Sequence, residues 1–167
     1  MTPRQTLLNW CDQTLQPQLF KDGAPNGLQI EGNDQIRHII TAVTASQAAI
    51  NHTITQGADT LLVHHGLFWR SEPTAIIGWK KQRIAALLAH NINLIGYHLP
   101  LDAHPTLGNN AQLAAKLNWQ PENTFGEQNL LNIGTLPENQ RTLAQLAQAI
   151  EQTLGRTPTI IGNPKQP

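Results

Sequence analysis

The sequence has little of several features that commonly indicate a function. Its single cysteine, Cys11, cannot form a disulfide within the chain, which fits a reducing compartment. Charged residues make up 13% of the 167 residues, and 11 basic residues balance 11 acidic ones. A chain without net charge lacks the electrostatic footprint of a protein that binds nucleic acid or an anionic membrane surface. No run approaches the ~20 apolar residues of a membrane span, and the first residues do not form a signal peptide. We therefore predict a soluble cytoplasmic protein that binds neither nucleic acid nor membranes.

Strand-like and helix-like segments alternate along the first 120 residues. The predicted strands are residues 36–43, 60–64 and 93–98, and the predicted helices are residues 47–56, 76–90 and 109–118. A strand, a helix and a second strand at this spacing form a βαβ unit with parallel strands. The pattern therefore predicts an α/β fold with an open, mostly parallel sheet and flanking helices.

The pattern changes after Trp119. Residues 120–123 have the character of a connection, 129–136 and 157–161 of strands, and a helix begins near Pro137. A segment this small cannot bury its own apolar face well. We therefore predict one α/β domain over residues 1–120 and the start of a second α/β domain over residues 121–167.

Metal-ligating side chains gather at the ends of two predicted strands. His64 and His65 end one strand, His98 ends another, and Asp102 and His104 follow in the next loop. In open α/β sheets, ligands bind beyond the carboxyl ends of the strands. We therefore expect these side chains to converge at one edge of the sheet.

The adjacent histidines suggest two metal ions. Neighbouring side chains of a strand point to opposite faces, so His64 and His65 can diverge toward two ions that the Asp102 carboxylate bridges. Imidazole and carboxylate ligands suit Zn, Fe or Mn, and two ions roughly 3.5–4 Å apart are typical of two-metal hydrolysis. Simpler roles remain open: Asp102 as a turn residue, His98 as a partner that orients a ligand, and His104 as a loop residue or a similar partner.

Several short motifs, taken in order, closely resemble the YbgI-like family, whose members are also called GTP cyclohydrolase 1 type 2 homologues or dinuclear-metal-centre proteins. The resemblance covers nearly the whole chain. The motifs are Ala24-Pro25-Asn26-Gly27-Leu28-Gln29, Val43-Thr44-Ala45-Ser46, Val63-His64-His65-Gly66, the segment from His98 to Pro105, and Gly108-Asn109-Asn110.

The resemblance implies a site and an assembly. It places metal ligands at His64, His65 and Asp102, and it implies two α/β domains in a toroidal homohexamer with the metal site facing the cavity. In this family a histidine and a glutamate near the C-terminus complete the site, and the sequence stops at Pro167 before that segment. We therefore expect a C-terminally truncated form with half of the site, either as a fragment of a longer chain or as a natural truncation.

Two functions follow from the sequence. The first is a metal-dependent, GTP cyclohydrolase-like hydrolase that uses two divalent ions on a nucleotide-like or heterocyclic small molecule. No P-loop is present to support GTP as the substrate. The second is a non-catalytic metal-binding or interaction protein, which an incomplete site favours.

Overall fold

The computed structural model describes residues 1–163 and residue 165. The chain forms two compact units, Met1–Leu101 and Asp102–Pro167. The sequence predicts the division after residue 120. The structure differs because helix α5 (Asn109–Leu117) packs against strand β7 (Gln120–Phe125) and helix α6 (Leu143–Leu154), and so belongs with the second unit.

A four-stranded sheet forms the centre of the first unit. Its order is β2 (Gly27–Ile30), β6 (Asn93–Gly96), β5 (Thr60–His65) and β4 (Ile39–Thr44). Strands β4, β5 and β6 are parallel, and β2 runs antiparallel at one edge. The predicted open, mostly parallel sheet is confirmed.

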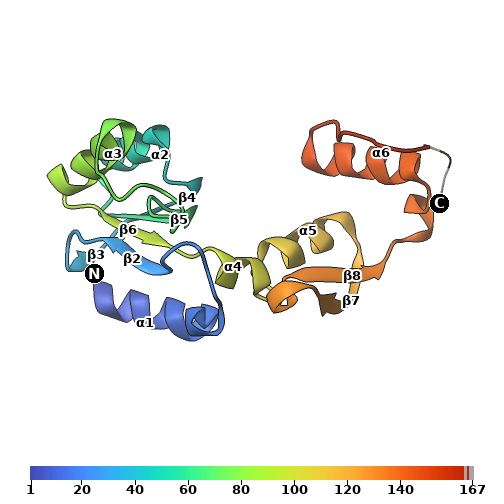
Figure 1. The fold of residues 1–167 in the computed structure, drawn as a ribbon, viewed down its shortest axis with the longest axis horizontal. Helices are drawn as coiled ribbons and strands as arrows, with labels where there is room; N and C mark the ends of the chain where they lie inside the picture. Colours follow the sequence, from blue (N-terminus) through green and yellow to red (C-terminus); the bar gives the residue numbers. More distant parts are fainter. Residues whose placement is uncertain (164, 166–167) are drawn as a thin grey trace. The chain divides into compact units, whose positions relative to one another are not determined.

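Helices cover both faces of this sheet (Figure 1). Helix α1 (Arg4–Leu15) lies on one face, and α2 (Gln47–Thr55) and α3 (Gly78–Ala89) lie on the other. Side chains alternate along β5 to fill both cores: Leu61 packs in the cluster toward α2 and α3, and Leu62 packs in the cluster toward α1. The two cores hold the carboxyl end of β5 in a fixed place.

Some predicted boundaries are wrong in detail. The strand expected at residues 36–43 consists of two pieces, because β3 (Gln35–Ile36) pairs with the N-terminal β1 (Thr2–Pro3) and β4 begins later. A 3-10 turn (Pro17–Leu19) follows α1. The chain after β6 enters a short helix, α4 (Leu99–Ala103), where the sequence predicted a loop.

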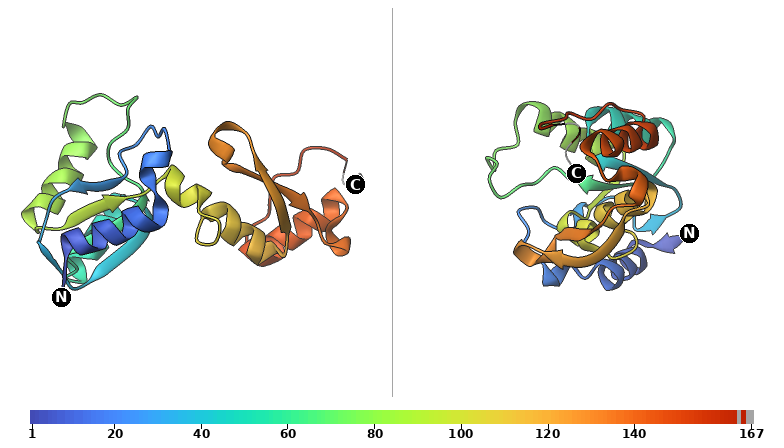
Figure 2. Two further views of the ribbon diagram at one scale, coloured as in Figure 1. Left: turned by 90° about the horizontal axis from the view of Figure 1, so that it is seen from below. Right: turned by 90° about the vertical axis from the view of Figure 1, so that its right-hand side faces the viewer.

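The second unit combines α5 and α6 with a twisted hairpin of β7 and β8 (Leu131–Thr135) (Figure 2). Short 3-10 turns follow β7 (Glu127–Asn129) and precede α6 (Glu138–Gln140). Residues 120–123, expected as a connection, belong to β7, and residues 157–161, expected as a strand, form none. The first error has a clear cause: β7 pairs with β8, and the polar sequence of β7 is tolerated because all six of its residues are exposed.

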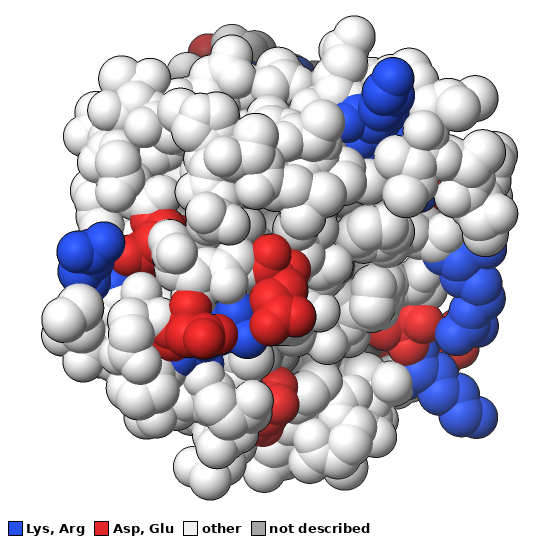
Figure 3. Space-filling model, turned by 90° about the vertical axis from the view of Figure 1, so that its left-hand side faces the viewer, with Lys and Arg blue, Asp and Glu red and all other residues white. Residues whose placement is uncertain are grey.

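The surface shows no broad area of one charge on the face in Figure 3. Most of that face is uncharged, and lysine and arginine side chains lie near acidic ones. None of the helices in the described residues combines the length and apolarity needed to cross a membrane.

Candidate metal centre

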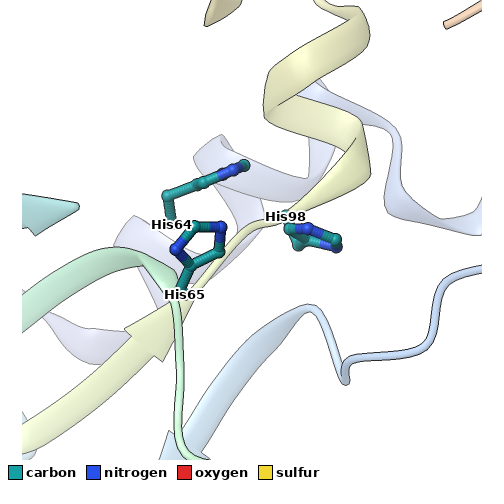
Figure 4. Close-up of side chains that lie close together, drawn as sticks. All are labelled: His64, His65 and His98. Atoms are coloured by element: carbon teal, nitrogen blue, oxygen red, sulfur yellow. The ribbon is translucent and has the colours of Figure 1, made fainter. Parts of the chain in front are cut away.

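Three histidines meet at the carboxyl edge of the first unit's sheet. His64 and His65 are the last residues of β5, and His98 follows β6, the parallel neighbour of β5. One potential ligand atom from each of the three side chains lies within 4.8 Å of the others (Figure 4). Parallel strands end at the same edge, so the topology itself produces this cluster.

The rings of the adjacent pair lie close together, although strand geometry had suggested that they diverge. The ring centroids of His64 and His65 lie 4.4 Å apart, and those of His98 lie 5.0 Å from His64 and 5.5 Å from His65. Both residues stand at the end of the strand, where each ring finds a partner on a neighbouring segment. Of the five side chains expected to converge, His64, His65 and His98 form one cluster.

The partners of His64 and His65 lie on the two flanking chains. His64 Nδ1 is 3.1 Å from the Tyr97 carbonyl oxygen, just after β6, and His65 Nδ1 is 3.2 Å from Thr44 Oγ1, at the end of β4. A carbonyl oxygen only accepts hydrogen bonds, so His64 Nδ1 donates and its lone pair is on Nε2. A hydroxyl can donate or accept, so the tautomer of His65 is not fixed by Thr44.

His98 is held by Asp22, a residue that the sequence interpretation did not single out. His98 Nδ1 lies 2.9 Å from Asp22 Oδ1, and the Asp22 side chain is 4% exposed. The same carboxylate accepts hydrogen bonds from the Ala24 and Leu99 amides and from the Asn26 side chain. Burial opposes ionisation, but the hydrogen bonds from His98 and these groups outweigh it and lower the pKa of Asp22 below its ordinary value. An ionised carboxylate behind an imidazole is a common support for metal-ligating histidines.

The loop over residues 22–27 therefore positions the site. Besides the Asp22 contact, the Asn26 Oδ1 atom accepts a hydrogen bond from the His98 amide at 2.8 Å. The signal that could have found Asp22 was chemical: a histidine at the end of a strand needs an acceptor for its second nitrogen, and Asp22 is the acidic residue of this loop.

Gln29 connects the two loops that carry the site. Its Nε2 donates to the Pro25 carbonyl at 2.8 Å, and its Oε1 accepts at 2.9 Å from the amide of Leu67, two residues after the histidine pair. The side chain passes so close to two glycines that a Cβ on Gly66 would lie 2.0 Å from Oε1, and one on Gly96 2.8 Å from Nε2. Both positions therefore exclude any side chain while Gln29 stays in place.

Trp69 forms an aromatic wall beside the cluster. Its ring meets the His98 ring edge-on, with centroids 5.0 Å apart, and lies 6.0 Å from the His65 ring. The next residue, Arg70, donates its backbone N–H to the Gly23 carbonyl at 2.8 Å, which ties this loop to the loop of Asp22.

Asp102 and His104 belong to the second unit. Asp102 lies in α4 rather than in a loop, and its Oδ1 accepts a hydrogen bond from Asn109 Nδ2 at 2.8 Å. Both residues line a pocket of about 390 Å³ within that unit. The structure thus groups His64 and His65 with His98, and it groups Asp102 with His104.

The donor set of the first unit fits a metal ion. Three partly buried imidazoles meet, and Nδ1 of His64 and of His98 faces an acceptor, which leaves Nε2 of each as a potential ligand atom. Imidazole ligands suit zinc and iron. Among the described residues, no other set of His, Cys, Asp and Glu side chains meets the same criterion.

The family model Duf34/NIF3 (NGG1p interacting factor 3) matches residues 2–167. A relative from Neisseria meningitidis serogroup A, described as a GTP cyclohydrolase 1 type 2 homolog, is 59% identical over 166 residues, which cover 99% of this chain and 66% of the relative. A Haemophilus influenzae protein with the same description is 53% identical over 89% of this chain and 60% of its own length. The chain thus spans 60–66% of the length of these two relatives.

Solved structures of similar proteins share the fold. The protein ybgI, of unknown function, is 44% identical and superposes with a TM-score of 0.90 over 95% of this chain and 63% of its own. TTHA1606 from Thermus thermophilus is 36% identical, with a TM-score of 0.82 over 95% of this chain and 64% of its own.

Proposed function

The chain belongs to the Duf34/NIF3 family, and from this premise we propose that it binds divalent metal ions at the cluster of His64, His65 and His98 and acts as a metal-dependent hydrolase on a nucleotide-like or heterocyclic small molecule. The observation that carries the proposal is the meeting of three imidazoles at the sheet edge where α/β proteins bind ligands. The confirmed resemblance to the GTP cyclohydrolase 1 type 2 homologues supports it.

In this proposal His64 and His65 would hold two divalent ions, Zn, Fe or Mn, His98 would be an additional imidazole, and Asp102 would supply a carboxylate ligand. When bound, such an ion would supply Lewis-acid chemistry, which activates water near neutral pH. The chain's own groups prepare the ligands: the Tyr97 carbonyl keeps the proton of His64 on Nδ1, and the Asp22 carboxylate does the same for His98.

The proposal also covers the localisation and the oligomeric state of the chain. The chain acts in the cytoplasm and forms a homohexamer, as the resemblance to the family implies. Light scattering coupled to size-exclusion chromatography measures the assembly directly. A mass of one chain at micromolar concentration, with and without metal, contradicts the hexamer.

Metal binding is tested by titrating metal-free protein with Zn²⁺ and Mn²⁺ in a calorimeter and by elemental analysis after desalting. We expect at least one ion per chain in the wild type and a loss of about tenfold or more in affinity in His64→Ala, because an imidazole ligand disappears. His52→Ala is the matched control, since His52 is exposed on α2. Metal-free wild-type protein after metal-replete purification contradicts the proposal.

The hydrolase part needs a separate experiment. Wild type and His64→Ala are screened with metal on nucleotides and on cyclic amide and heterocyclic compounds. Activity in the wild type that falls with the loss of His64 supports an enzyme. Equal rates in the two proteins remove the hydrolase and leave a non-catalytic metal-binding protein.

A further inference from the structure

The pocket of about 390 Å³ in the second unit has no role in the metal proposal beyond Asp102. Its walls come from the end of α4, the loop that follows, the start of α5 and both strands of the β7–β8 hairpin. The volume lies in the range of about 300–1,000 Å³ that is usual for small-molecule sites. Its polar lining includes His104, Glu122, Asn123 and Asn132.

His104 presents a hydrogen-bond donor to its surroundings. Its Nδ1 accepts hydrogen bonds from the backbone amides of Leu107 at 3.0 Å and Thr106 at 3.3 Å. A backbone amide only donates, so Nδ1 carries the lone pair and the ring proton is on Nε2. This is the opposite of His64 and His98, whose Nδ1 atoms donate. His104 is thus prepared to donate a hydrogen bond through Nε2 rather than to ligate a metal through it.

The charges of the lining disfavour an anionic ligand. Asp102 and Glu122 are carboxylates, and none of the described lining residues is a lysine or an arginine. In the metal-free chain, a phosphate in this pocket would meet two negative charges without a basic partner. An N–H group of a ligand would instead meet the carboxylate oxygens, which accept hydrogen bonds. The side-chain amides of Asn123 and Asn132 can donate or accept. The lining therefore disfavours an anion and offers hydrogen-bond partners to an uncharged polar molecule that carries both kinds of group.

We propose that this pocket binds an uncharged nitrogen heterocycle through a lactam edge, whose carbonyl accepts from His104 Nε2 and whose ring N–H donates to the Glu122 carboxylate. Proline and alanine side chains of the lining, such as Pro105 and Ala111, offer apolar surface for the flat ring. The inference rests on the proposed function in one respect: it names this ring as part of the substrate. Binding itself requires no metal.

The test uses two probes that differ in the lactam. Hypoxanthine has adjacent ring N–H and carbonyl groups, and purine lacks the carbonyl. Each is titrated into the metal-free full chain with EDTA present, and binding is followed by the chemical shifts of backbone amides in nuclear magnetic resonance spectra. We expect saturable shifts at residues of the pocket and an affinity for hypoxanthine about tenfold or more above that for purine, because one or two hydrogen bonds differ. Inorganic phosphate is expected to cause no saturable shift there.

Two variants assign the contacts. In His104→Asn the side-chain oxygen can replace Nδ1 as the acceptor for the backbone amides, so the turn is preserved while the Nε2 donor is lost. Glu122→Gln removes a carboxylate of the pocket, and Glu127→Gln, outside the lining, is its matched control. We expect both pocket variants to bind hypoxanthine about tenfold more weakly, with unchanged Zn²⁺ affinity in His104→Asn and unchanged hypoxanthine binding in Glu127→Gln.

The outcomes separate this inference from the metal proposal. Equal binding of hypoxanthine and purine, no binding of either, or preferential binding of phosphate overturns the inference. Unchanged hypoxanthine affinity in His104→Asn also overturns it. Failure of Zn²⁺ to bind, together with selective hypoxanthine binding, overturns the metal proposal and leaves the pocket assignment standing.

Discussion

The support of His98 by Asp22 makes a quantitative prediction for Asp22→Asn. The wild-type carboxylate, 4% exposed, accepts four hydrogen bonds: Oδ1 from His98 and Ala24, and Oδ2 from Leu99 and Asn26. The amide of the variant has one acceptor oxygen, so its NH₂ group must face two of these donors. A buried donor without a partner costs about 1–3 kcal/mol, so we expect the loss of two acceptor contacts to lower the free energy of unfolding by about 2–6 kcal/mol.

The same substitution separates folding from metal binding. Loss of the carboxylate behind a ligating histidine typically weakens metal affinity by about 10–100-fold. The assay combines urea unfolding of the metal-free chain, followed by tryptophan fluorescence, with calorimetric titration of Zn²⁺. Glu138→Gln is the control, because its side chain is 87% exposed. Unchanged Zn²⁺ affinity in a folded Asp22→Asn protein would refute the idea that Asp22 prepares His98 as a ligand.

Two further predictions concern the first unit. Gly66→Ala is expected to destabilise the chain by about 1–3 kcal/mol in urea unfolding, because the added Cβ would lie 2.0 Å from Gln29 Oε1. Gly23→Ala is the control and should change the free energy of unfolding little, because its Cβ would meet nothing within 4 Å. In a chain that already carries Gln29→Ala, Gly66→Ala should cost less. A double variant whose loss of stability equals the sum of the two single losses contradicts this. Burial, and secondarily the charge of Asp12, raise the pKa of the Cys11 thiol. Less thiolate is therefore present at pH 8 than in an ordinary thiol, and alkylation of the native chain should be slower than in urea; equal rates contradict the burial.

The sequence predicted much of the first unit because its signals are local. The apolar run before His64 and the β-branched run at 39–43 specify parallel strands that lie side by side in the sheet. Parallel pairing then brings the two strand ends to one edge, so His64, His65 and His98 could be placed together before any coordinates were known.

The second unit was predicted less well for a physical reason. The strand β7 contains Pro121, Glu122 and Asn123, which favour loops, and its pairing with β8 overrides that preference. The division between units was misplaced for a related reason, because α5 packs on this hairpin, and a helical pattern does not say which sheet the helix will join.

The sequence by itself determined the type of fold and the family, and it placed His64, His65 and His98 at the ends of predicted strands, because these depend on residue order and periodicity along short segments. The tertiary structure decided how the rings are held. Asp22 and His98 are far apart in the chain, and so are Gln29 and Leu67, yet each pair is joined by a hydrogen bond. Such contacts leave no periodic trace in the sequence, since they follow from loop paths that only the folded chain fixes.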